Sequence, residues 1–175
     1  MKLHAIILKS FLIMSIGFVF GCTNYKPLET VSNVDVEKYM GKWYEISTIP
    51  QRFQKGCHCT TAEYTLSEQG FVKVKNSCRK DSVNGPVSQI EGKAFIVKNS
   101  NNSKLQVQFF WPMRAKYWII DLAPDYSYAV VGHPNRKYLW ILSRTPELND
   151  AIYQQIINRL KEKDYNIDLL VKTVH

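Results

Sequence analysis

Residues 105–111 read LQVQFFW, and the alternation within this stretch decides the fold class. Leu105, Val107, Phe109 and Trp111 alternate as apolar residues, set against the polar Gln106 and Gln108. A period of two places the two sets of side chains on opposite faces of a β-strand. The sequence therefore predicts a strand over residues 104–110, with one face toward an apolar interior and the other toward water.

Other short segments, also rich in aromatic and β-branched residues, flank this strand on both sides. Together they predict eight strands, at residues 43–49, 58–66, 71–78, 88–97, 104–110, 116–122, 127–132 and 137–143. Turn-forming residues separate the segments, so we expect an all-β, antiparallel, up-and-down meander. Eight such strands lose their exposed edges by closing into a barrel, or calyx, that has room for one small ligand.

One segment has helical periodicity. Within residues 146–163, Ile152, Ile156 and Leu160 recur at fourfold spacing, and Asn149 or Asp150 can cap the first turn. We expect this helix to pack on the outside of the barrel and a short final strand to follow within residues 167–174. A membrane-spanning barrel is the competing architecture, but several of the strands are too short for it and carry charge.

The N-terminal segment has the composition of a secretory signal. Lys2 and Lys9 precede an apolar run at residues 11–20, and the first acidic residue is Glu29. Residues 19–22, VFGC, resemble the lipobox of bacterial lipoprotein precursors, which implies cleavage after residue 21 and acylation of Cys22. The expected organisation is a signal peptide at 1–21, a lipidated tether at 22–34 and one folded domain at 35–175. An ordinary secreted protein with an incidental cysteine remains the alternative.

The residue after the lipobox cysteine bears on localisation. Thr23 stands where lipoproteins retained at the inner membrane commonly have Asp, so the resemblance implies a lipid anchor on the periplasmic face of the outer membrane. The chain is basic, with 23 Lys and Arg against 15 Asp and Glu. This surplus is scattered and contains no nucleic-acid module, so a solvated surface near anionic lipid is favoured over nucleic-acid binding.

Three cysteines, Cys57, Cys59 and Cys78, remain after Cys22, and an exported chain favours one disulfide. If residues 67–70 form a four-residue loop with Leu66 opposite Phe71, Cys59 falls opposite Cys78. Cys59–Cys78 is therefore the predicted pair; a bulge or a one-residue change in the loop would shift this register, and Cys57 remains the alternative partner. A metal site is disfavoured because zinc usually needs four ligands, so we expect no metal.

Three stretches carry a resemblance to a known family. Residues 40–46, MGKWYEI, residues 125–132, DYSYAVVG, and residues 138–146, YLWILSRTP, resemble the three signature regions of the lipocalins, in particular the bacterial lipoproteins and the apolipoprotein D-like branch. The resemblance extends over nearly the whole mature chain. It implies a structural signature of Gly41, Trp43 and Arg144, with the Arg144 guanidinium stacked on the Trp43 ring at the closed end of the barrel.

Alternation and the same resemblance together suggest a binding site. The residues expected on or near the cavity wall are Trp140, Trp111, Phe109, Phe95, Ile90 and Tyr64. Arg114 is expected at the rim, where a cation could hold a carboxylate or phosphate group. The other interpretation, that any of the wall residues only packs in the core or on the outer face, is left open.

The expected function is to bind and store or transport a fatty acid or lysophospholipid at the outer membrane. The chain has no nucleophile elbow, Ser/His/Asp order, metal-ligand set or phosphate loop, so we expect no catalytic residue, no cofactor and no enzyme activity. Two alternatives remain: a thiol-dependent enzyme acting on lipid peroxides through the unpaired cysteine, and a scaffold lipoprotein with a filled barrel. The expected partners are the ligand and the membrane, with no nucleic acid, and a homodimer is left open.

Overall fold

A computed structural model of the chain describes residues 26–175, and nine strands and two α-helices lie within this range. The predicted signal peptide and the predicted acylation site at Cys22 lie outside the described residues. The strands are β1 Gly41–Thr48, β2 Cys57–Leu66, β3 Val72–Lys80, β4 Val87–Ile96, β5 Lys104–Gln108, β6 Ala115–Leu122, β7 Tyr128–Gly132, β8 Leu139–Ser143 and β9 Val171–Lys172. The helical segments are α1 Val36–Tyr39, η1 Arg52–Gln54, α2 Asp150–Glu162 and η2 Ile167–Leu169.

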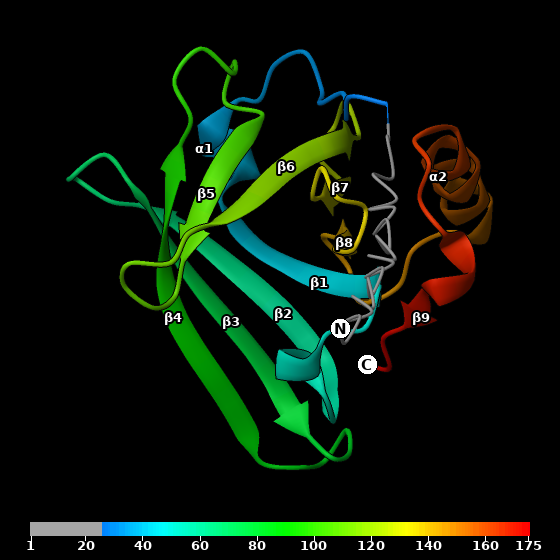
Figure 1. Ribbon diagram of the computed structural model, residues 1–175. Helices are drawn as coiled ribbons and strands as arrows, with labels where there is room; N and C mark the ends of the chain where they lie inside the picture. Colours follow the sequence, from blue (N-terminus) through cyan, green and yellow to red (C-terminus); the bar gives the residue numbers. More distant parts are fainter. Residues whose placement is uncertain (1–25) are drawn as a thin grey trace, which may run out of the picture.

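The first eight strands form a closed antiparallel barrel, which confirms the predicted fold class (Figure 1). Each strand from β2 to β7 pairs with the next one along the chain, and β1 closes the cylinder by pairing with both β8 and β2. The loops at residues 49–56, 81–86, 109–114 and 133–138 consequently lie together at one end of the barrel, which we call the open end. The other hairpin loops and α1 lie at the closed end.

A bulge in β1 gives the two ends of this strand different surroundings. The register against β8 shifts between Glu45 and Ser47. Glu45 therefore stays on the inner side, while Ile46 packs in the outer apolar cluster and the Ser47 hydroxyl bonds the hydroxyl of Tyr153 in α2 at 3.0 Å. Such a bulge increases the local twist, which helps the sheet to curl closed.

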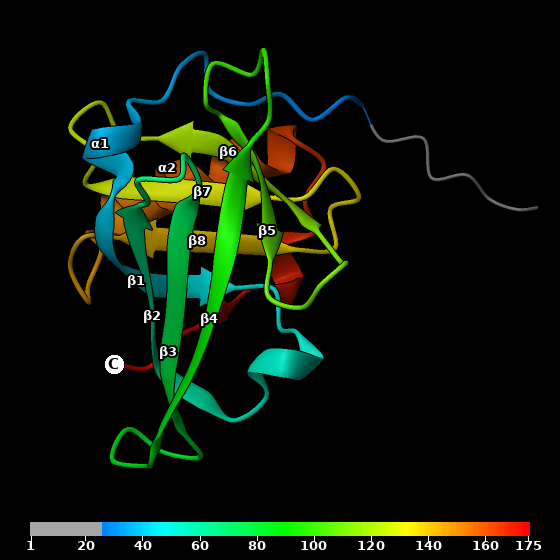
Figure 2. The same cartoon turned by 90° about the vertical axis from the view of Figure 1, so that its left-hand side faces the viewer.

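Helix α2 covers one outer face of the barrel, as predicted (Figure 2). The side chain of Asn149 accepts bonds from the backbone N–H groups of Ala151 and Ile152, and so caps the helix. Ile156 and Leu160 are buried against Ile120, Val130 and other outward side chains of β6 to β8. The fold thus has two apolar clusters, one inside the barrel and one between the barrel and α2.

The described part of the expected tether, residues 26–34, makes contacts with the barrel. Leu28 and Val34 are buried, and the backbone N–H groups of Val31 and Val34 donate to the carbonyls of Ile119 and Asn101. The described part of the segment therefore lies along the barrel, because Val34 packs in the inner apolar cluster and Leu28 in the outer one. The segment has no periodic pattern of apolar residues, so its sequence does not predict these contacts.

The disulfide joins Cys57 to Cys78, so the predicted pair Cys59–Cys78 is wrong and the alternative is correct. Two features shift the register. Leu66 pairs with Val72 rather than Phe71, so the hairpin loop is one residue longer than expected, and a bulge lies between His58 and Thr61. Cys59 adopts a positive φ of 50° in this bulge and is left as a free cysteine.

The C-terminal residues complete the wall. Strand β9 pairs with Ser47 and Thr48 of β1, so the predicted final strand is present but short. Beyond β9, Thr173 N–H donates to the Ile46 carbonyl, and the Val174 carbonyl accepts from Cys59 N–H. The tail therefore bridges the part of the wall where β1 and β2 no longer pair with each other.

Candidate ligand-binding site

A cavity of about 720 Å³ lies inside the barrel and is bordered by residues of the open-end loops. Its lining is mostly apolar and aromatic, and includes Phe53, Tyr64, Val107, Phe109 and Trp140. This volume falls in the range of sites that hold one small molecule. The barrel is therefore hollow in its open half.

The closed end is sealed by packing around Trp43. This ring is fully buried, and its Nε1 donates to the Tyr39 carbonyl at 2.9 Å. The Arg144 guanidinium carbon lies 3.7 Å from the ring centroid, the stacking that the resemblance implied. The same guanidinium donates to the carbonyls of Lys42 and Lys38, at 3.0 and 2.6 Å.

Gly41 completes this arrangement. It has a φ of 90°, a left-handed conformation that favours glycine, and a Cβ there would come within 3.4 Å of the Arg144 guanidinium. The three signature residues thus form one structural unit at the end of the barrel opposite to the cavity opening.

Tyr64 and Tyr117 line the inner end of the cavity, and Tyr117 is bonded in turn to the buried Tyr39. The Tyr117 hydroxyl lies 2.8 Å from that of Tyr39 and 2.9 Å from that of Tyr64, within one hydrogen-bonded chain. Burial raises the pKa of Tyr64 to about 12 and also raises the pKa of Tyr39 and Tyr117. All three hydroxyls therefore stay neutral at physiological pH, and this end of the cavity is polar without being charged.

Four of the expected wall residues line the cavity. Tyr64, Ile90, Phe109 and Trp140 reach it from β2, β4, the β5–β6 loop and β8. The Phe109 ring lies against Gly92, where a Cβ would come within 2.7 Å of a ring carbon. Glycine at that position leaves the space that the ring occupies.

Phe95 and Trp111 are not among the lining residues, and the expectation for both is wrong. Phe95 pairs with Gln106 and packs beside Phe71 on the outer face. Because Ile90 is five positions earlier on the same strand, the two residues necessarily face opposite sides. Trp111 lies beyond the end of β5 and is 86% exposed, so the alternation of that strand does not extend to it.

Arg114 borders the cavity at its rim, but its charge is turned away. The guanidinium carbon lies 4.0 Å from the Phe95 ring centroid, and Nη1 donates to Gln106 Oε1 at 3.5 Å. Both partners belong to the outer face. The arrangement does not direct this cation at a group inside the cavity.

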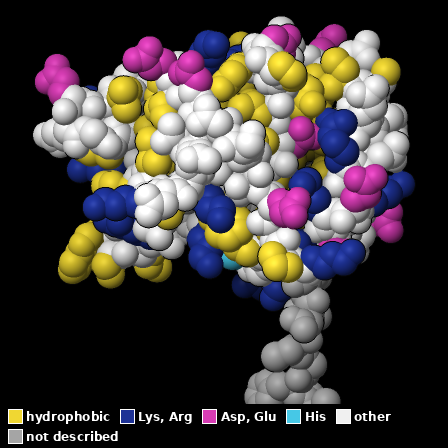
Figure 3. All heavy atoms as spheres, turned by 90° about the horizontal axis from the view of Figure 1, so that it is seen from above, with side chains coloured by type: hydrophobic (Ala, Val, Ile, Leu, Met, Phe, Trp, Pro, Cys, Tyr) yellow, Lys and Arg dark blue, Asp and Glu magenta, His cyan; other side chains and the backbone are white. Residues whose placement is uncertain are grey.

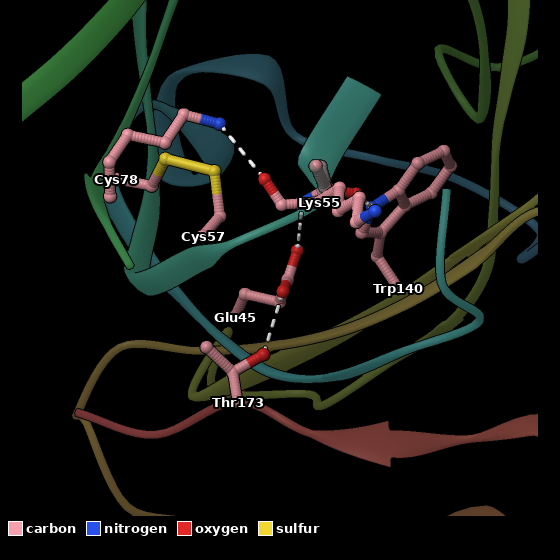
Figure 4. The surroundings of a disulfide bond; sticks show 8 residues. Glu45, Lys55, Cys57, Cys78, Trp140 and Thr173 are labelled. Carbon is pink, nitrogen blue, oxygen red and sulfur yellow. Dashed lines mark hydrogen bonds between the residues drawn. A yellow bond between two sulfur atoms is a disulfide. The ribbon is translucent and has the colours of Figure 1, made fainter. Parts of the chain in front are cut away.

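A buried carboxyl group, which the sequence analysis missed, borders the cavity near the open end. Glu45 is only 4% exposed; its Oε1 accepts from Thr173 at 2.6 Å and its Oε2 from Gln54 Nε2 at 2.8 Å. Gln54 Oε1 in turn accepts from Trp140 Nε1 at 3.1 Å. Figure 4 shows Glu45 between Thr173 and the loop that contains Lys55, with Trp140 beside that loop.

Burial raises the pKa of Glu45 above its usual value, although the bonds from Thr173 and Gln54 and the nearby charge of His175 oppose this shift. The signal for an inward Glu45 was present in the sequence, since Glu45 is two positions after the inward Trp43. Its partners could not be found that way, because Thr173 is 128 positions away.

Two further polar atoms of the lining have no partner among the described residues. They are Thr60 Oγ1 and Asn76 Oδ1, on the inner faces of β2 and β3. A buried polar atom without a hydrogen bond costs about 1 to 3 kcal/mol. Both atoms are themselves shielded from the open cavity, since each has almost no accessible surface.

A second depression, of about 480 Å³, lies on the outer face of β2 to β4. Its border is largely charged and includes Glu63, Lys73, Lys75, Glu91 and Lys93. Such a border suits a solvated surface better than an apolar ligand. The interior cavity is consequently the stronger candidate site.

Within residues 26–175, no three His, Cys, Asp or Glu side chains are grouped as metal ligands would be. No helix of the same range has the length and apolar content needed to cross a bilayer.

Comparisons with known proteins agree with this architecture. Residues 34–175 match the model of the Lipocalin-like domain. The chain is 39% identical to temperature-induced lipocalin-1 of Arabidopsis thaliana, over 86% of this chain and 84% of that protein. It is 34% identical to the outer membrane lipoprotein Blc of Vibrio cholerae, over 92% and 95%, and 33% identical to that of Escherichia coli K12, over 87% and 88%.

Among solved structures, insecticyanin from the tobacco hornworm has a TM-score of 0.68 at 23% sequence identity, and the match covers 86% of each chain. Apocrustacyanin C2 has a TM-score of 0.64 at 21% identity, over 81% of this chain and 79% of that one. At this level of identity the likeness extends to the fold alone.

Proposed function

The chain belongs to the Lipocalin-like domain family, and from this premise we propose that it binds one lipid-like amphipathic molecule, a fatty acid or lysophospholipid, in the barrel cavity. Lipocalins bind small hydrophobic ligands. The observation that carries the proposal is the cavity of about 720 Å³ with its aromatic wall. The wall would take the acyl chain of the ligand.

Binding and transport without chemical transformation is favoured over the thiol-dependent reaction. The free cysteine of the described chain, Cys59, does not belong to the cavity lining. A ligand inside the barrel would therefore lie away from the thiol. A filled scaffold barrel is likewise disfavoured by the size of the cavity.

We further propose that residues 1–21 are a signal peptide and that Cys22 is acylated, which would hold the protein at the periplasmic face of the outer membrane. Residues 19–22 support this proposal, and so do the relatives whose name is outer membrane lipoprotein. Cys22→Ser should move the protein from the membrane fraction to the soluble periplasmic fraction or leave it as unprocessed precursor without acyl chains. Metabolic labelling with palmitate that persists in Cys22→Ser would contradict the assignment.

Calorimetric titration with lysophosphatidylcholine tests the cavity. Phe109→Ala removes an aromatic wall side chain and should weaken binding by about tenfold or more. The matched control is Phe95→Ala, which removes an equal ring from the outer face and should leave the affinity unchanged. Equal loss in both variants, or no saturable binding by the wild-type protein to lysolipid or fatty acid, would refute the proposed function.

A further inference from the structure

The open end of the barrel exposes a group of large apolar side chains, which we call the mouth rim: Phe53, Phe110, Trp111 and Met113. Their side chains are between 63% and 86% exposed. Phe53, Phe110 and Met113 also border the cavity, so the apolar lining continues onto the outside of the molecule. Contiguous exposed apolar groups of this kind mark a surface that contacts a protein or a membrane.

The charges around the mouth rim favour an anionic surface. Exposed Arg52, Lys55, Arg114 and Lys137 lie in the open-end loops, where Asp81 is the one acidic residue. The hairpin loops at the closed end instead carry Glu68 and Asp125, with Lys98 as their one cation. Figure 3 shows hydrophobic side chains projecting at the lower left with Lys and Arg beside them, and acidic side chains along the upper edge.

The start of the described chain lies at the same end. Arg136, in the β7–β8 loop, donates from Nη2 to the Lys26 carbonyl at 2.7 Å. In Figure 2 the described chain begins on the side where η1 and the β5–β6 loop lie. Cys22 precedes Lys26 by four residues, so the chain between them spans at most about 14 Å.

From these three observations we propose that the open end of the barrel docks on an anionic lipid bilayer, the same bilayer that would hold an acylated Cys22. The mouth rim enters the headgroup region, and the surrounding Arg and Lys side chains contact lipid phosphates. A lipid-like ligand then passes between the leaflet and the cavity without crossing water. This inference rests on the proposed function for the identity of the ligand and on the proposed acylation for the anchor.

Trp111 provides the test, because it is the most exposed member of the mouth rim. The full-length acylated protein is reconstituted in vesicles of phosphatidylcholine and phosphatidylglycerol in equal parts, with bromine atoms on the acyl chains near the headgroups. The difference between the wild-type protein and Trp111→Phe isolates the fluorescence of Trp111 from that of the other tryptophans. We expect bromine to quench this component strongly, and quenching to fall when phosphatidylcholine is the only lipid.

The control places a tryptophan at the opposite end. Leu66 is exposed at the closed end of β2, so Leu66→Trp in the Trp111→Phe background should not be quenched. Quenching of the Leu66→Trp probe equal to that of Trp111, or vesicle-bound protein with unquenched Trp111, would overturn the docking proposal. Calorimetric titration without vesicles reports separately on the cavity, so failure of docking and failure of ligand binding are distinguishable.

Discussion

Single side chains at the two ends of the barrel differ in what they contribute to the fold. At the closed end, Arg144 and Trp43 bring the residues before β1 and after β8 together and cover the end of the barrel. Near the open end, Glu45, Gln54 and Trp140 link β1, the first open-end loop and β8 through side-chain bonds. The first group should govern stability, and the second should respond to pH.

Arg144→Ala should lower the free energy of unfolding by about 2 kcal/mol, because it removes the cation stacked on Trp43 and leaves the carbonyls of Lys38, Lys42 and Tyr126 without their donor. Ligand affinity should change little, since the cavity opens at the other end. Urea denaturation measures the effect. The matched control is Arg114→Ala, which removes an exposed arginine that also stacks on an aromatic ring and should change stability only slightly. Normal unfolding of Arg144→Ala with loss of ligand would contradict this assignment.

Glu45 should make the fold less stable as the pH rises. Burial raises the pKa of Glu45 in the folded protein. The stabilisation linked to its protonated form is therefore fully present below the unfolded pKa of about 4.3, and it is lost as the pH rises through the folded pKa. Within that window the free energy of unfolding should fall by up to about 1.4 kcal/mol per pH unit. Glu45→Gln should remove this slope and stabilise the protein at neutral pH. Urea denaturation over a pH series measures it, with exposed Glu91→Gln as the control.

If Glu45→Gln keeps the pH slope of the wild-type protein, the carboxyl group is not the source of that slope. A destabilised Glu45→Gln at neutral pH would show that the bonds from Thr173 and Gln54 require the charged form.

At the scale of elements, bulges and loop lengths determine which side chains meet, in addition to the regular strand pairing. The bulge at residues 58–61 and the longer β2–β3 loop place Cys57, not Cys59, within reach of Cys78. The bulge at Ile46 keeps consecutive residues of β1 in contact with α2. The C-terminal tail then bonds to both bulged strands.

Cysteine variants test this register. In a Cys22→Ser background, Cys78→Ser should lower the free energy of unfolding by about 3 kcal/mol, because the sequence separation of 21 residues closes a loop of moderate length. Cys59→Ser in the same background should be nearly neutral and should leave no titratable thiol after unfolding. Two reactive thiols in that variant would indicate that Cys59 is the true partner of Cys78.

At the scale of the whole molecule, the barrel is asymmetric along its axis: one end is packed and the other is hollow. The inner apolar cluster occupies the closed half and extends to the cavity wall. A ligand would extend this core into the open half and so act on the stability of the complete barrel. Ligand binding should therefore raise the stability of the barrel.

A ligand present at one hundred times its dissociation constant should raise the free energy of unfolding by about 2.7 kcal/mol. Urea denaturation with and without lysophosphatidylcholine below its micellar concentration measures the increase. At the same concentration Phe109→Ala should gain markedly less than the wild-type protein, and Phe95→Ala should gain as much. An equal gain in Phe109→Ala would place the ligand outside the cavity.

Much of the architecture follows from local sequence. The alternation around Val107 predicts a strand with a buried and a solvated face, and the spacing of Ile156 and Leu160 predicts the helix that covers the barrel. These features depend on residues that are close together in the chain. The motifs around Trp43 and Arg144 likewise sufficed to indicate the family.

The contacts that define the site were decided by tertiary structure alone. One extra loop residue and one bulge changed the cysteine pairing, because register depends on backbone geometry that a pattern of residue types does not encode. The surroundings of Glu45 depend on Thr173, far along the chain. The placement of residues 26–34 depends on contacts with Asn101 and Ile119, which lie far away in the sequence. Composition and periodicity report which faces are apolar, whereas long-range packing determines which of those faces meet.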